Sequence, residues 1–213
     1  MLKKYEILKK LQAGKVVAVV RGINAHDAYE ISKACIRGGI LNIEVTFTTP
    51  GALEVIHRLS DEAKNSDAVI GAGTVLDPET ARIAILNGAE YIVSPHFSKD
   101  ISEICNLYSI PYMPGCLTVT EMVEALKTGV DVVKVFPGGL AGTSYIENIK
   151  GPLPNINLMP SGGVSLDNVA EWLQKGSFAA GIGSVLTKGI EPGNYEEVEK
   201  RAKQFSEKVK DLL

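Results

Sequence analysis

One recurring pattern, a helical stretch that ends at a glycine and is followed by a short β-branched run, constrains the fold of this chain most. It appears at residues 37–47, 87–95, 128–137 and 175–184. Glycine suits the left-handed position that closes a helix. The β-branched run that follows is typical of a buried parallel strand. The chain is therefore expected to alternate helices with parallel strands.

Extending this pattern along the chain predicts eight strands and eight helices, which implies right-handed crossovers and a parallel sheet. We expect a single (β/α)8 TIM barrel over residues 1–213, with a short N-terminal helix formed by the amphipathic stretch Met1 to Lys10. An open doubly wound sheet is the alternative, but no G-x-G-x-x-G motif follows the first strand. The expected strands are 16–20, 41–47, 68–73, 91–95, 112–115, 132–137, 157–160 and 179–183, and the expected helices lie near 24–38, 50–60, 78–87, 99–108, 119–128, 142–149, 166–175 and 194–212.

Composition argues against several classes of function. With 213 residues and 45% hydrophobic content, the chain can build one sizeable core but not two ordinary enzyme domains. A net charge of -3 supplies no basic field for nucleic acid, and no apolar run approaches the ~18 residues of a membrane span. The N-terminus lacks the apolar centre of a signal peptide. Cys35, Cys105 and Cys116 show no paired spacing, so we expect no disulfide framework and no zinc site, and a cytoplasmic location.

The expected strand at 132–137 carries a lysine among valines. Alternation places Lys134 on one face of the strand and Val133 and Val135 on the other. If the valines pack on the helices, Lys134 points into the barrel, where burial disfavours the charged ammonium form. A neutral amine there could attack a ketone carbonyl. A structural lysine paired with a carboxylate is an equally good interpretation of this strand alone.

The expected strand at 41–47 favours the catalytic interpretation. Ile43, Val45 and Phe47 share one parity, so Glu44 shares the other and points into the same lumen as Lys134. A buried carboxylate beside a lysine could move protons in both directions, as a general acid–base must. A plain buried ion pair is the alternative, and such a pair is weak evidence for stability.

Two glycine-rich turns follow the last two expected strands. Ser161, Gly162 and Gly163 follow one strand, and Gly183 and Ser184 follow the other. Barrels often bind phosphate at these two positions, through backbone N–H groups and a short helix N-terminus. A tight turn would explain one such motif, but the pair indicates a phosphate site.

Other strand ends supply possible partners for a substrate carboxylate. Thr74 follows Gly71-Ala72-Gly73, whose small residues leave room beside the lysine. Arg21 ends the first strand and could bind a carboxylate through two hydrogen bonds, although a solvated surface arginine is as good an interpretation. His96 lies near the expected mouth, where a substrate contact is weakly supported.

Several motifs together resemble the 2-keto-3-deoxy-6-phosphogluconate and 4-hydroxy-2-oxoglutarate (KDPG/KHG) aldolase family. They are GAGTVLDPE, IVSPHF, MPG, VKVFPG, PSGGVSLDNV and GIGS, in order over roughly residues 15 to 190. The resemblance implies a class I aldolase that needs no metal or other cofactor, binds a phosphorylated 2-keto-3-deoxy sugar acid and forms a homotrimer. It implies these roles: Lys134 forms the Schiff base, Glu44 is the acid–base, Thr74, Pro95 and Phe136 line the substrate site, and Ser161, Gly162, Gly163, Gly183 and Ser184 bind phosphate.

One position departs from this family's pattern. Thr48 stands where many members carry an arginine that binds the substrate carboxylate. Other members place an arginine at the end of the first strand, as Arg21 does here, so we expect Arg21 to take over or share that role beside Thr48.

The resemblance implies reversible cleavage of 2-dehydro-3-deoxy-6-phosphogluconate to pyruvate and D-glyceraldehyde 3-phosphate, with 4-hydroxy-2-oxoglutarate as a further possible substrate. Three alternatives stay open at this point. One is the same chemistry on the galactonate epimer, another is a phosphate-binding barrel isomerase or epimerase, and the third is a non-catalytic barrel that binds a sugar phosphate. The joint presence of Lys134 and Glu44 argues against the last of these.

Overall fold

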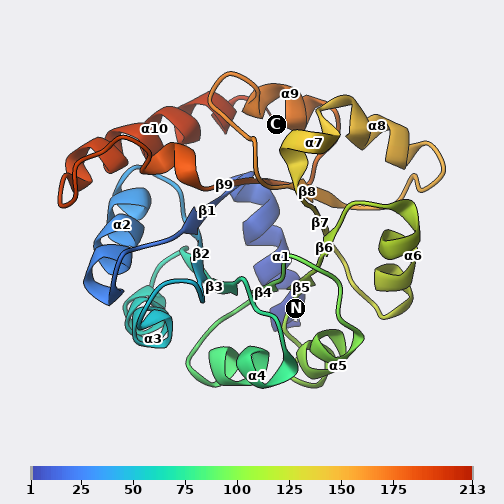
Figure 1. Ribbon diagram of the computed structural model, residues 1–213, viewed down its shortest axis with the longest axis horizontal. Helices are drawn as coiled ribbons and strands as arrows, with labels where there is room; N and C mark the ends of the chain where they lie inside the picture. The colour runs from blue at the N-terminus through green and yellow to red at the C-terminus, as the bar shows by residue number, and fades with distance from the viewer. Residues whose placement is uncertain (1, 213) are drawn as a thin grey trace.

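The computed structural model describes residues 2–212 and confirms the expected barrel. Figure 1 shows helices arranged as an outer ring around the strands. All strand pairs are parallel, in the orders β5-β4-β3-β2-β1-β9 and β6-β7-β8. The strands are β1 (Val16–Val20), β2 (Asn42–Thr46), β3 (Val69–Gly73), β4 (Ile92–Val93), β5 (Tyr112–Met113), β6 (Gly115–Cys116), β7 (Val133–Val135), β8 (Leu158–Pro160) and β9 (Ala180–Ile182).

Two junctions join the two sheets into one barrel. Between β8 and β9, Ser161 forms a parallel bridge with Gly181, and the Phe178 N–H donates to the Leu158 carbonyl at 2.8 Å. The other junction is Pro114, which divides the expected strand 112–115 into β5 and β6 because proline has no N–H to donate. With β5 and β6 counted as one strand that is interrupted at Pro114, the described segments β1 to β9 form the eight strands that the sequence predicts.

The helices follow the expected alternation, and several begin at side chains that cap them. The side chains of Asn24, Asp77 and Ser98 each accept a hydrogen bond from a backbone N–H in the first turn, and Thr118 forms a capping box with Glu121. The short helices α7 and η1 were not expected. The helices are α1 (Lys3–Gly14), α2 (Ala25–Arg37), α3 (Ala52–Ala63), α4 (Pro78–Leu86), α5 (Lys99–Leu107), α6 (Val119–Lys127), α7 (Gly138–Ala141), α8 (Ser144–Lys150), α9 (Val169–Gln174), η1 (Ser184–Leu186) and α10 (Tyr195–Lys210).

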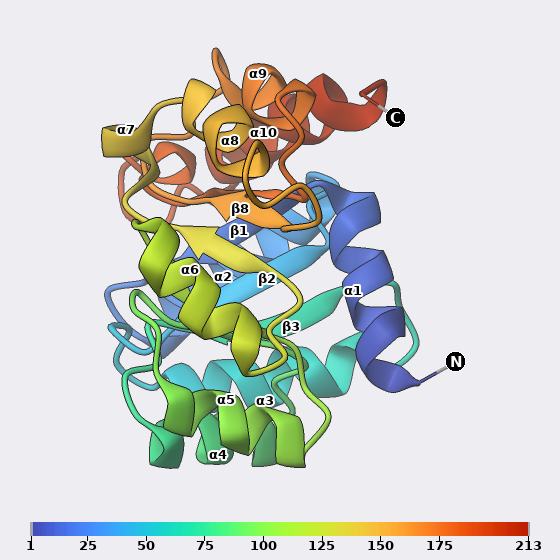
Figure 2. The ribbon, with the colours of Figure 1, turned by 90° about the vertical axis from the view of Figure 1, so that its right-hand side faces the viewer.

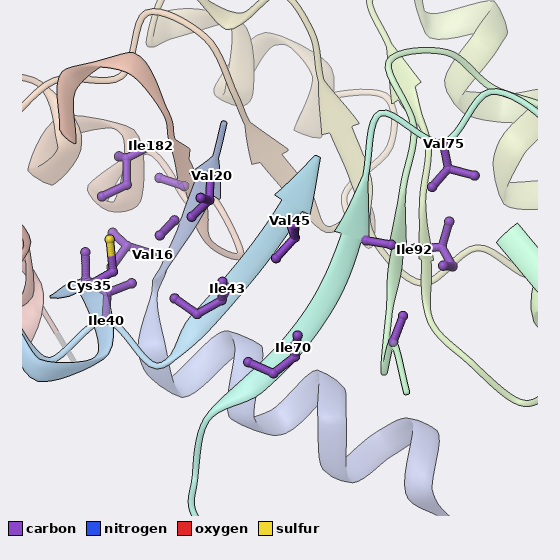
Figure 3. Close-up of a cluster of buried hydrophobic side chains, with 14 of the residues drawn as sticks. Val16, Val20, Cys35, Ile40, Ile43, Val45, Ile70, Val75, Ile92 and Ile182 are labelled. Atoms are coloured by element: carbon purple, nitrogen blue, oxygen red, sulfur yellow. The ribbon is translucent and has the colours of Figure 1, made fainter. Parts of the chain in front are cut away.

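Apolar side chains pack on both faces of the barrel wall. On the outer face they contact the surrounding helices, and Figure 3 shows Ile43, Val45, Ile70 and Ile92 in this layer. A smaller inner cluster contains Val17, Val69, Tyr91, Val93, Met113, Val132, Met159 and Ala179. This division follows the two-residue period of a strand, which sends alternate side chains to opposite faces.

Helix α1 covers the N-terminal end of the barrel. Its residues Ile7, Leu8 and Leu11 are buried in the inner cluster, and Lys4 forms a 2.7 Å ion pair with Asp131 just before β7. Figure 2 shows α1 across one end of the strands and α7 at the other. The expected helix Met1 to Lys10 therefore exists but extends to Gly14, and Met1 itself lies outside the described residues. Because α1 closes this end, a substrate must enter at the C-terminal ends of the strands.

Within residues 2–212, the structure contains no helix with the length and apolar character that crossing a bilayer requires.

Candidate active site

Lys134 and Glu44 face each other inside the barrel, as strand parity predicts. Val133 and Val135 on β7, and Ile43 and Val45 on β2, belong to the outer cluster, which leaves the two charged side chains on the inner face. The Lys134 Nζ lies 3.9 Å from the Glu44 Oε1. Lys134 is 5% exposed and Glu44 is 1% exposed.

The geometry of this pair differs from that of a structural salt bridge. A charge-assisted hydrogen bond between an ammonium and a carboxylate is ~2.7–2.9 Å long, and 3.9 Å exceeds that length. Neither oxygen of the Glu44 carboxyl group has a hydrogen-bond partner among residues 2–212. A buried polar group without a partner costs free energy and calls for an explanation. The separation leaves Glu44 able to bond a group on a substrate that is attached to Lys134.

The surroundings of Glu44 act on its pKa in opposite directions. Burial raises the pKa of Glu44, and the positive charges of Lys134 and Arg21 oppose that shift. A carboxyl group whose pKa is raised holds a proton more readily than an exposed one, so it can return a proton as well as accept one, as a general acid–base must.

Glycine on β3 makes room for the Glu44 side chain. A Cβ atom at Gly73 would lie 2.0 Å from the Glu44 Oε1, and a Cβ at Gly71 would lie 2.4 Å from the ring of Tyr91. The sequence predicts that these small residues leave space beside the lysine. In the structure, Glu44 and Tyr91 fill that space, so Gly73 permits the carboxylate to reach its position.

Phe136 lies near the lysine, and Pro95 packs on Gly115, the β6 residue that pairs with Lys134. The Lys134 Nζ is 5.0 Å from the centre of the Phe136 ring, within the range of a cation–π contact. The Phe136–Pro137 peptide bond is cis. Pro95 is half-buried after β4, and its carbonyl packs closely on Gly115, where a Cβ would lie 2.3 Å from the oxygen.

Thr74 adopts an unusual backbone conformation at the end of β3. Its φ of 55° lies in the left-handed region, which is rare for a β-branched residue and stores strain of about 1–3 kcal/mol. The side chain is half-buried. Strain of this kind clusters at functional sites, and the role of Thr74 in substrate binding stays a prediction.

Arg21 and Thr48 lie on two loops that hydrogen bonds hold together. The Gly22 N–H donates to the Thr49 Oγ1 at 3.1 Å, and the Thr46 hydroxyl donates to the Val20 carbonyl at 3.0 Å. The Thr48 hydroxyl lies 2.9 Å from that of Thr46, so it belongs to this loop network. Arg21 is exposed, and its charge acts on Glu44. Arg21, unlike Thr48, has a positively charged side chain that can bind a carboxylate.

The two glycine-rich turns lie on neighbouring strands, β8 and β9. Gly162 and Gly163 are exposed, both have φ of 81°, and their N–H groups have no acceptor among the described residues. Consecutive backbone N–H groups of this kind form a concave site for an anion. Ser161 is buried at the β8–β9 bridge, and the half-buried Gly183 precedes the exposed Ser184 at the start of η1.

Helix α7 supports the first of these turns, a role that the sequence analysis missed. The Gly138 N–H donates to the Ser161 carbonyl at 2.8 Å. A Cβ at Gly163 would lie 2.6 Å from the Gly139 Cα. The Gly138-Gly139 pair after the VKVFP motif was the available signal, because backbone segments this close require glycine.

A cavity of about 1090 Å³ lies away from these residues, near the N-terminal ends of β1, β2 and β3. Many of its lining side chains are charged, and some pair with one another, such as Arg37 with Glu199 at 2.6 Å. Lys134 and Glu44 do not line it. In residues 2–212, no group of three or more His, Cys, Asp and Glu side chains is arranged to hold a metal ion.

Together, the closed barrel and the polar residues at the C-terminal ends of its strands define a (β/α)8-barrel enzyme. The profile of the KDPG and KHG aldolase family matches residues 7–201, so the chain belongs to that family, as the sequence motifs suggest.

Similar proteins of known name support this assignment. A 2-dehydro-3-deoxy-phosphogluconate aldolase of Treponema pallidum is 35% identical over 90% of this chain and 92% of its own length. A 2-dehydro-3-deoxy-6-phosphogalactonate aldolase of Escherichia coli is 33% identical over 92% of this chain and 93% of its own.

Solved structures agree with these relatives. The KDPG aldolase of Legionella pneumophila, captured with pyruvate as a covalent carbinolamine, superposes with a TM-score of 0.82 at 27% identity, covering 92% of this chain and 96% of that chain. A native KDPGal structure gives a TM-score of 0.85 at 30% identity over 92% of this chain and 94% of that one.

Proposed function

We propose that this protein is a class I aldolase that reversibly cleaves 2-dehydro-3-deoxy-6-phosphogluconate to pyruvate and D-glyceraldehyde 3-phosphate. The observation that carries the proposal is the buried Lys134, whose Nζ lies 3.9 Å from the carboxylate of the buried Glu44. The covalent carbinolamine captured with pyruvate in the Legionella relative supports an amine nucleophile of this kind.

The reaction begins at Lys134. Its unprotonated amine attacks the C2 ketone, and the carbinolamine hydroxyl takes up a proton from solvent and leaves as water. The product is a protonated imine, which then serves as the electron sink. Glu44 removes the C4 hydroxyl proton, directly or through a water. The C3–C4 electron pair moves toward the imine, so that an enamine forms and the aldehyde leaves. Glu44 returns a proton to C3, and hydrolysis of the protonated imine releases pyruvate, restores the neutral Lys134 amine and gives the proton taken up earlier back to solvent.

The remaining site residues hold the two ends of the substrate. Arg21 and Thr74 bind the carboxylate, next to Thr48, and Pro95 and Phe136 line the pyruvate side. The turns at Ser161, Gly162 and Gly163 and at Gly183 and Ser184 hold the distal phosphate through backbone N–H groups. Binding energy from the remote phosphate orients the C3–C4 bond between Lys134 and Glu44.

A second substrate assignment is the galactonate epimer, which the 33% identical Escherichia coli relative is named for. A KHG/KDPG aldolase of the same organism, 30% identical to this chain, supports 4-hydroxy-2-oxoglutarate as a further substrate. Cleavage of the two epimers and of 4-hydroxy-2-oxoglutarate, compared by kcat/KM at equal enzyme concentration, separates these assignments.

The family resemblance also supports a homotrimer. Large apolar side chains are exposed on one pair of neighbouring helices, with Leu86 at the end of α4 64% exposed and Leu107 at the end of α5 76% exposed. Exposed apolar surface of this kind often marks subunit contacts. Sedimentation equilibrium gives the mass in solution, and a mass of one chain would exclude the trimer.

A cleavage assay on Lys134→Met tests the proposed activity. Pyruvate release from the phosphorylated substrate is expected to fall by about 10⁴-fold or more, because loss of the nucleophile removes the covalent route. Lys99→Met, which alters an exposed lysine on α5, is the matched control and keeps normal turnover. Normal turnover of Lys134→Met would exclude Lys134 as the Schiff-base residue, and no turnover by the unaltered protein on any of the three substrates would exclude the activity.

A further inference from the structure

A second buried polar group, the Tyr91 hydroxyl, lies in the barrel lumen and has no part in the mechanism above. Tyr91 immediately precedes β4, belongs to the inner cluster and is 0% exposed. Its hydroxyl has no hydrogen-bond partner among the described residues. A buried tyrosine usually finds a partner for its hydroxyl, so an unpartnered one inside the barrel calls for an explanation.

The charged group that acts most strongly on Tyr91 is the Glu44 carboxylate, which shares one face of β3 with it. The Tyr91 ring lies over Gly71, where a Cβ would be 2.4 Å from its Cζ, and Glu44 lies over Gly73, where a Cβ would be 2.0 Å from its Oε1. Residues two apart on one strand face are separated by ~6.6 Å. The two glycines thus place the Tyr91 ring, just before β4, and the Glu44 carboxylate, from β2, over neighbouring positions on one face of β3.

Three further charged groups act on these two side chains. Lys134 on β7 and Arg21 at the end of β1 face Glu44, and Glu90 acts on Tyr91 from its own segment. Burial, and then the charges of Glu44 and Glu90, raise the pKa of Tyr91 well above its ordinary value. The hydroxyl therefore stays protonated, and remains a donor, over the pH range in which Glu44 titrates.

We propose that Tyr91 is a positioning residue for Glu44, whose carboxylate accepts a hydrogen bond from the Tyr91 hydroxyl directly, after a rotation of the Glu44 side chain, or through one bridging water. The catalytic meaning of the contact rests on the proposed function of Glu44. A neutral donor favours the ionised form of a carboxylate, so Tyr91 opposes the effect of burial and keeps Glu44 ready to accept the C4 hydroxyl proton. It also fixes one oxygen, which leaves the other for the substrate.

The substitution Tyr91→Phe tests this role, because it keeps the ring over Gly71 and removes only the hydroxyl. The matched control is Tyr112→Phe, since Tyr112 is also buried but belongs to the outer cluster, where its hydroxyl donates to the His96 carbonyl at 3.2 Å. The carboxyl carbon of Glu44 is followed by ¹³C NMR across a pH titration of each free protein, with Glu44→Gln assigning the resonance. We expect Tyr91→Phe to raise the Glu44 midpoint by about one to two pH units, the range for a hydrogen bond to a charged group.

The kinetic counterpart is the acidic limb of the kcat/KM profile. Tyr91→Phe is expected to shift this limb to higher pH by the same amount as the NMR midpoint, with activity well above the limb close to that of the unaltered protein. Tyr112→Phe should leave the limb in place. An unchanged Glu44 midpoint and an unchanged limb in Tyr91→Phe would overturn the proposal and leave Tyr91 as a packing residue.

A measurement without a Tyr91 variant covers the case in which Tyr91→Phe does not fold. In the unaltered protein, the ¹³Cζ chemical shift of Tyr91 should change with the same pH midpoint as the Glu44 carboxyl group. In Glu44→Gln this change should disappear. If the unaltered protein shows no such change, the contact is contradicted. Neither NMR titration requires aldolase activity. A protein that shows the coupled titration but cleaves no keto acid would thus refute the proposed function while retaining the contact.

Discussion

The two ends of the site are built in different ways. At the lysine end, two buried side chains from opposite parts of the barrel, Lys134 and Glu44, take their positions from strand parity and from the space above Gly73. At the end proposed to bind phosphate, the exposed backbone N–H groups of Gly162 and Gly163 are positioned by left-handed glycine conformations and by the support of α7. The first end depends on side-chain chemistry and the second on backbone shape, so substitutions at the two ends should change different kinetic constants.

The largest effect in this comparison is expected from Glu44→Gln. The variant keeps the shape of the side chain but cannot carry a proton, so kcat should fall by about 10²–10⁴-fold, the usual contribution of a general acid–base. Imine formation with pyruvate at Lys134 should largely remain. Glu103→Gln, on the exposed surface of α5, is the matched control. Near-normal turnover of Glu44→Gln would remove Glu44 from the acid–base role.

A smaller effect at the same end is expected from Gly73→Ala. The new methyl would lie 2.0 Å from the present position of the Glu44 Oε1, so the carboxylate must move, and misplacement by about 1 Å costs roughly 10²-fold in rate. Gly151→Ala is the control, because a Cβ there would lie an ordinary 3.5 Å from its nearest neighbour, the Asn148 carbonyl oxygen. An unchanged kcat in Gly73→Ala would show that the position of Glu44 is not critical.

At the phosphate end, Gly163→Ala should change KM rather than kcat. Its φ of 81° and the 2.6 Å approach to the Gly139 Cα both exclude a side chain. Distorting the turn weakens hydrogen bonds to a charged group, so KM for the phosphorylated substrate should rise about 10- to 100-fold. KM for unphosphorylated 4-hydroxy-2-oxoglutarate, if it is a substrate, should change little. An equal rise for both substrates would place the phosphate elsewhere.

The smallest expected effect is on stability and depends on pH. The pKa of Glu44 in the folded protein is raised above its ordinary value of 4.5. The stability that protonated Glu44 contributes is therefore fully present below pH 4.5, and it is lost as the pH rises through the folded-state pKa. Glu44→Gln lacks this loss. The free energy of unfolding of the variant minus that of the unaltered protein should therefore increase from pH 4 to pH 8, by about 1.4 kcal/mol for each unit of the raised pKa. Urea unfolding at several pH values measures it, and a difference that does not vary with pH would contradict the raised pKa.

The sequence is sufficient to predict most of the fold because the period of the strands and the glycines that end the helices are local signals. β1 matches the expected strand 16–20, and Lys134 and Glu44 point inward as their parity requires. The break at Pro114 follows from a proline inside the expected strand 112–115, whereas helix α7 depends on contacts between distant segments. Helix α7 forms where Gly138 bonds to Ser161, far away in the sequence.

The same distinction explains what the sequence analysis missed in the site. The parity of the expected strand 91–95 could have placed Tyr91 in the lumen, since Tyr91 and Val93 both belong to the inner cluster. That its ring lies over Gly71, one step along β3 from the space filled by Glu44, follows only from the packing of three strands. Side-chain direction can be predicted from a single strand, but the partner of a buried polar atom requires the assembled barrel.

The most direct test of the central claim is borohydride reduction of the unaltered protein in the presence of pyruvate, followed by peptide mass spectrometry. The imine at Lys134 should be trapped as a stable secondary amine, so the peptide that contains Lys134 gains the mass of one reduced pyruvate, and Lys134→Met gains none. A protein that cleaves its substrate but acquires no pyruvate-derived mass at Lys134 would contradict the Schiff-base account.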